Sequence, residues 1–169
     1  NFLIATDLGA PVYEKLGFET ETEYLFYKNI SRSSKWKTSN HLIPYREDLK
    51  DQIAKIDREV SGENRMFHLE PHLQSAYVYL IGSVVEGFYL PAFGDGLIVA
   101  KTDVAGLELM KMRMMDKDSA SFPINNQVAS RFMEENNLHA YKKAKRMIVG
   151  KSKETLFSKI FNRVGGNIG

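Results

Sequence analysis

Apolar and polar residues recur along the chain with spacings that predict alternating strands and helices. From Leu49 to Val60, apolar residues return every three or four positions, which predicts a helix over 48–60 with one buried face. A second short helix is expected over 65–73. The runs 75–81 and 84–92 are rich in β-forming residues and meet at Gly82-Ser83, which predicts a hairpin.

The second half of the chain alternates strand and helix patterns. Strands are expected over 97–100, 120–124 and 138–149, and helices over 125–136 and 153–164. Between them, Thr102 or Asp103 is expected to cap a helix that reaches about Met115, with Val104, Leu107, Met110 and Met114 facing inward. A hairpin followed by strand–helix–strand crossovers predicts a mixed α/β fold, with a partly antiparallel sheet and helices on both faces.

The first residues carry a strand, a turn and a helix ended by Gly17, and the same layout returns at 122–138. In this alignment Phe2 falls on Phe122 and Phe18 on Leu138. A repeat indicates that the chain opens with the end of one domain and then holds a second copy. We therefore predict a remnant of a first domain at 1–29, a polar linker at 30–40 and a second domain at 41–169. Within the linker, Trp36 is expected to dock on a neighbouring surface.

Composition excludes several classes of protein. The chain is 43% hydrophobic and 26% charged with a net charge of +2, which gives no large field toward nucleic acid or membrane. Its apolar runs are far shorter than a membrane span, and no leader pattern follows Asn1, so we expect a cytoplasmic protein and a cleaved or truncated chain. The absence of cysteine excludes thiolate metal sites and a cysteine nucleophile.

Several segments carry a resemblance to a known family. YEKLGF, which begins at Tyr13, resembles the end of a GNAT-superfamily N-acetyltransferase domain, and the rest resembles the C-terminal half of tandem-GNAT proteins. The matching pieces are 56–65, 86–110, 122–126, 144–150 and 156–169. The resemblance implies a GNAT-like acyl-CoA N-acyltransferase fold, and it implies that most of a first GNAT domain lies upstream of this chain.

The resemblance also implies a chemistry. In the family, acetyl-CoA is the co-substrate, lies where two strands splay apart and rests its pyrophosphate on the N-terminus of the next helix. A small-molecule or protein amine attacks the thioester directly, and a tyrosine protonates the departing thiolate. Carried over to this sequence, Tyr13 is the general acid, and Lys101, Thr102 and Gly106 are the cofactor-binding positions.

The same residues leave a second interpretation open. Tyr13 could instead pack its ring at the edge of a core. The loop that starts at Lys101 has one glycine, and Asp103 would repel a pyrophosphate. Met133 replaces the tyrosine in the second copy and cannot donate a proton. Two hypotheses therefore stand: the C-terminal part of an acetyl-CoA-dependent N-acetyltransferase, or a non-catalytic GNAT-like module for substrate binding or self-association.

Two clusters have alternative interpretations. His68 and His72 could begin a zinc site, but Pro71 interrupts the helix, so a surface pair without metal is favoured. The basic run from Lys142 to Arg146 is expected to form a solvated edge rather than a nucleic-acid site, with contact to an acidic substrate or to CoA phosphates as a further alternative. Unpaired strand edges in the remnant predict a homodimer in which the remnant completes a sheet.

Overall fold

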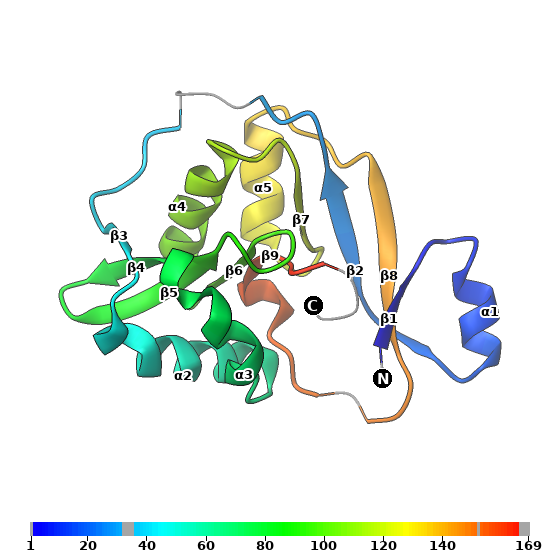
Figure 1. The fold of residues 1–169 in the computed structure, drawn as a ribbon. Helices are drawn as coiled ribbons and strands as arrows, with labels where there is room; N and C mark the ends of the chain where they lie inside the picture. The colour runs from blue at the N-terminus through cyan, green and yellow to red at the C-terminus, as the bar shows by residue number, and fades with distance from the viewer. Residues whose placement is uncertain (1, 32–35, 152, 166–169) are drawn as a thin grey trace.

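The computed structural model describes residues 2–31, 36–151 and 153–165, which form two antiparallel sheets with helices packed against them (Figure 1). The first sheet has the order β1-β8-β2-β7, with strands at Phe2–Ala5, Lys142–Ile148, Glu19–Tyr27 and Ala120–Pro123. The second has the order β3-β4-β5-β6-β9, with strands at Leu42–Pro44, Tyr77–Ile81, Val84–Leu90, Leu97–Ala100 and Ile160–Asn162.

The helices lie between the strands in chain order. They are α1 (Ala10–Lys15), α2 (Lys50–Ser61), α3 (Met66–Leu69), α4 (Asp103–Met114) and α5 (Gln127–Glu135), with 3-10 turns at Glu47–Leu49, Glu70–Ser75 and Phe157–Lys159. The predicted mixed α/β fold is confirmed. Among the described residues, no helix is long and apolar enough to cross a membrane.

The predicted helix over 153–164 is wrong. The segment instead forms a 3-10 turn and then β9, which pairs antiparallel with β6. The spacing of apolar residues fits this arrangement as well as it fits a helix, because Ile160 and Phe161 are buried while Leu156 is half exposed. Pairing with a distant strand, which the local pattern does not encode, decides the structure here.

The suspected repeat has a structural counterpart. The helix ends match: Gly17 and Asn137 both have positive φ, at 82° and 58°. The residues that follow them, Phe18 and Leu138, each donate a backbone hydrogen bond five residues back, to the carbonyls of Tyr13 (3.1 Å) and Met133 (2.9 Å). The two strand–helix–strand units therefore share their helix-end geometry at the offset that aligns Phe2 with Phe122.

The two units also pair with each other. In the antiparallel pair β2·β8, Tyr24 faces Ala144, its own counterpart under the same offset, so the pairing has a local pseudo-two-fold axis. β1 pairs with β8, and β2 lies between β8 and β7. The strands of segment 1–29 thus share one sheet with strands from 41–169. The domain division remains a prediction.

The segment predicted as a linker contributes to the core through two of its apolar residues. Ile30 is buried and its N–H donates to the carbonyl of Asp118 at 2.8 Å. Trp36 is buried and its ring lies 5.4 Å from that of Phe132. The expectation that Trp36 docks on a neighbouring surface is confirmed.

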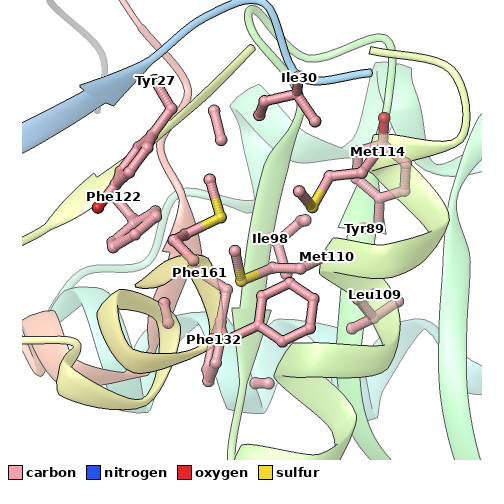
Figure 2. Close-up of a cluster of buried hydrophobic side chains, with 14 of the residues drawn as sticks. Tyr27, Ile30, Tyr89, Ile98, Leu109, Met110, Met114, Phe122, Phe132 and Phe161 are labelled. Carbon is pink, nitrogen blue, oxygen red and sulfur yellow. The ribbon is translucent and has the colours of Figure 1, made fainter. Parts of the chain in front are cut away.

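Strand β9 delivers Phe161 to the middle of the main apolar core. The ring is fully buried, and Figure 2 shows it between Phe122 and Ile98, close to Met110 and Phe132. Its face lies against Gly106 of α4, where a Cβ atom would overlap the ring carbons. Helix α4 can approach β9 this closely only because position 106 has no side chain.

Replacing Gly17 by alanine should destabilise the protein by about 1 kcal/mol, because a Cβ is unfavourable at positive φ. An added Cβ would have no atom within 4 Å, so the cost is conformational. Urea unfolding followed by circular dichroism measures it. Asn137→Gly is the matched control in the second copy, and its stability should change by less than about 0.5 kcal/mol. An unchanged Gly17→Ala variant would contradict the assigned helix end.

Replacing Gly106 by alanine should destabilise the protein by about 1 to 3 kcal/mol, because the new methyl group overlaps the ring of Phe161. The sign is informative: in a helix with open space beside it, Gly→Ala would stabilise by about 0.5 to 1 kcal/mol. The same unfolding assay applies. In a Phe161→Leu background, Gly106→Ala should cost less stability than it does in the parent, because the overlapping ring is gone. A stabilised Gly106→Ala variant would show that Phe161 does not occupy this position.

Candidate functional site

The N-terminus of α4 holds the predicted cofactor-binding residues. Thr102 is its N-cap: the Thr102 hydroxyl oxygen accepts from the N–H of Ala105 at 3.3 Å. The same hydroxyl donates to Oε2 of Glu86 on β5 at 2.8 Å. Lys101 is exposed, and its N–H donates to the carbonyl of Glu86 at 2.7 Å. The structure therefore brings Lys101, Thr102 and Gly106 together at one helix end, where Thr102 serves as a cap.

The charges around this helix end oppose an anion. Asp103 lies in the first turn of α4, and Glu86 is hydrogen-bonded to the cap, so two carboxylates stand where the helix dipole would otherwise attract a pyrophosphate. Lys159, from the turn before β9, approaches Asp103 at 3.5 Å. Lys159 thus already places a positive charge beside Asp103 at this helix end.

Strand β9 occupies the space between β6 and β7 (Figure 1). On one side Asn162 pairs with Ile98 of β6. On the other side the N–H of Arg163 donates to the carbonyl of Ser121 at 2.8 Å, and the N–H of Ser121 donates to Oδ1 of Asn162 at 2.9 Å. These strands are the ones that the resemblance expects to splay apart around pantetheine. Their facing backbone groups are engaged by β9, so the residues of 41–169 do not fit acetyl-CoA at this position.

Tyr13 lies elsewhere. It is on α1, beyond β1 at the far edge of the first sheet from α4 (Figure 1). Its ring packs edge-on against Phe18 at 5.8 Å and is partly buried. The structure therefore does not join Tyr13 to the residues at the start of α4. Met133, its counterpart in the second copy, is fully buried.

A cavity of about 440 Å³ lies where β1, β2 and β8 approach the end of α2 and helix α3. It contains three functional candidates that sequence reasoning missed, namely Arg65, Glu21 and Tyr24, together with Arg146 from the basic run. The basic run was expected to be a solvated edge, but the side chain of Arg146 is only 13% exposed and pairs with Glu21 at 2.9 Å. That expectation is wrong for Arg146, because the pairing of β8 with β2 turns this residue into the cavity.

One signal in the sequence could have identified part of this cavity. Asp57 follows Ile56 and lies on the apolar face of α2, one turn from Ile53 and Val60. A carboxylate on a buried face requires a buried cationic partner. The partner is Arg65, whose guanidinium binds Asp57 through two nitrogens. No comparable signal marks the burial of Arg146.

The histidine pair has no metal-binding surroundings among the described residues, where no group of three or more His, Cys, Asp or Glu side chains could hold an ion. The ring of His72 stacks on Phe93 at 4.8 Å, and that of His68 contacts Phe67 at 5.5 Å. Both histidines thus make aromatic contacts instead.

No protein-family model and no curated protein matches the sequence. Solved structures do match the fold. A Pyrococcus horikoshii protein assigned as an acetyltransferase superposes with a TM-score of 0.76 over 97% of this chain, at 18% identity. A GNAT-family acetyltransferase from Colwellia psychrerythraea superposes with a TM-score of 0.58 over 86% of this chain, at 8% identity. This chain spans 58% and 63% of the lengths of those two chains.

Likeness at these identities establishes the architecture. The crossover helices and the position of α4 after β6 agree with the expectations drawn from the sequence. The chain has the fold of the GNAT acetyltransferases.

Proposed function

We propose that this chain is part of a cytoplasmic acetyl-CoA-dependent N-acetyltransferase, in which residues 41–169 form a GNAT-fold unit without an acetyl-CoA site of its own. The main support is the position of β9, which fills the gap between β6 and β7 and packs Phe161 on Gly106. The carboxylates of Glu86 and Asp103 at the start of α4 support it further. The role of this unit is then to complete the sheet and to shape the acceptor side.

For the segment 1–29 we infer a catalytic contribution from Tyr13. When an amine attacks a thioester carbonyl, a thiolate departs, and a nearby hydroxyl can supply the proton that it needs. Tyr13 sits on α1 directly after β1, a strand that pairs on one side only, with β8, among the described residues. The counterpart edge on β7 is covered by the chain itself. The glycine-rich phosphate loop is not in 1–29, so residues upstream of this chain would complete the site.

A specific observation favours self-association as the second candidate function. Leu8, Val12 and Leu16 recur every four residues and are 93%, 59% and 66% exposed. They adjoin β1, whose outer edge would accept a further strand. In this interpretation the chain is a non-catalytic module that forms a homodimer through the remnant strands. Light scattering would then give a dimer, and Val12→Glu would convert it to a monomer.

Calorimetric titration of acetyl-CoA into the 169-residue protein should give no saturable binding, because β9 closes the position between β6 and β7. Tight binding by this chain would contradict the closed cleft.

The full gene product should bind acetyl-CoA and release free thiol in the presence of amines. Tyr13→Phe should lower kcat by about 10²-fold, because it removes a general acid. Tyr45→Phe is the matched control, since the hydroxyl of Tyr45 is bonded to Glu47 at 2.8 Å on the surface, and it should leave kcat unchanged. A full-length protein that turns over no acetyl-CoA would favour the non-catalytic module.

A further inference from the structure

The cavity beside α2 is built around two arginines whose positions are fixed by carboxylates. Nε and Nη2 of Arg65 donate to the carboxylate of Asp57 at 2.8–3.1 Å, and the two side chains are 13% and 2% exposed. Asp57 thus holds one side of the guanidinium and leaves Nη1 outside the ion pair. A buried carboxylate behind an arginine is an arrangement that orients the remaining N–H groups.

Arg146 is held in a similar way from the opposite wall. Its Nε donates to Glu21 at 2.9 Å, and Glu21 is 8% exposed. The guanidinium lies over the ring of Phe2 at 3.9 Å and faces that of Phe157 at 5.6 Å. Rings on two sides and a carboxylate at one edge restrict this side chain to one orientation.

Tyr24 lines the same cavity as the two arginines. Burial raises the pKa of Tyr24, and the positive charges of Arg146, Arg163 and Arg65 act in the opposite direction. The hydroxyl therefore stays neutral at physiological pH, and the charges of Arg65 and Arg146 both reach it. Two fixed guanidinium groups and a neutral hydroxyl thus line the same cavity.

Charge in the cavity is positive overall. Among the described residues, the ionised groups that line it are Arg65, Arg146, Lys151, Lys153, Glu21 and Glu63. Asp57 behind Arg65 adds a third carboxylate, so four cations stand against three carboxylates. The buried groups balance one another, since Arg65 pairs with Asp57 and Arg146 pairs with Glu21. The excess positive charge lies at the exposed rim, where Lys151 and Lys153 stand against Glu63. This rim favours the approach of an anion to the N–H groups of the two fixed arginines.

Part of the wall of the same cavity is apolar. Phe2 and Phe157 flank Arg146, and Ile148 and Ile160 line the cavity beside them. A volume of about 440 Å³ lies within the range of small-molecule sites. An inorganic ion would leave these apolar surfaces in contact with water, whereas an organic anion would cover them.

We propose that this cavity binds a small organic carboxylate, with the carboxylate on Arg65 and Arg146 and the apolar body against Phe2 and Phe157. This inference does not rest on acetyl transfer, because it concerns ligand binding by the described chain. The proposed function can fail while the cavity still binds its ligand, and the reverse also holds.

Calorimetric titration of the 169-residue protein with three probes tests the proposal: 4-phenylbutyrate, its neutral amide, and inorganic phosphate. Saturable binding is expected for 4-phenylbutyrate, with binding at least about ten-fold weaker for the amide, which lacks the charge. Phosphate should also bind more weakly, because it leaves the apolar walls uncovered. Equal binding of the amide, equal binding of phosphate, or no saturable binding of 4-phenylbutyrate would each overturn the proposal.

Two variants locate the binding. Arg146→Gln should weaken 4-phenylbutyrate binding about ten-fold, with circular dichroism as the check on folding. Lys151→Gln removes an exposed charge from the cavity rim without touching a buried ion pair, and should weaken binding about two- to three-fold. The matched control is Lys117→Gln, an exposed lysine outside the cavity, which should bind as the parent does. The site would be overturned if Lys151→Gln and a correctly folded Arg146→Gln both bound 4-phenylbutyrate as tightly as the parent.

Discussion

Strand β9 joins the two sheets of this molecule. It hydrogen-bonds to β6 in one sheet and, through Asn162 and Arg163, to Ser121 in the other. A strand buried in this way must have both edges satisfied, since an unpaired backbone group in the interior is costly. The ring of Phe161 adds an apolar contribution of up to about 3 kcal/mol. The geometry that closes the cleft is therefore the same geometry that completes the core.

This double role limits the chemistry available to the unit. In a GNAT fold the gap between the two central strands is where a thioester would lie, and here its backbone groups are structural. A ligand between β6 and β7 would have to displace β9, whose Phe161 packs on Gly106. The cavity that we propose as a ligand site lies on another face, where buried carboxylates hold two arginines in position.

Elements with local signals could be predicted from the sequence, and elements set by distant pairing could not. Thr102 caps α4 as expected, because capping depends on residues a few positions apart. Strand β6 was also placed correctly. Within α4, Val104 was expected inward but is 60% exposed, since Ala105, Gly106 and Leu109 are the buried residues of this stretch. The helix predicted over 153–164 is wrong because the strand that pairs with this segment, β6, lies far away in the sequence.

The candidate sites show the same division. Sequence reasoning recognised that Asp103 disfavours an anion at α4, because charge and helix position are local facts. It missed the burial of Arg146, which depends on the register between β2 and β8 and on the approach of Phe2 and Phe157. Asp57 offered a partial clue, since a carboxylate on an apolar helix face needs a partner. Tyr13 remains a prediction.

The place of β9 in the chain has a consequence for biosynthesis. Among the described residues, every other strand of both sheets precedes β9 in the chain, so the ribosome has already delivered those strands when β9 appears. Until then β6 and β7 have open edges, and the pocket around Gly106 has no aromatic ring to fill it. The nascent protein is thus committed to a late closing step, during which its interior is accessible to chaperones and to aggregation.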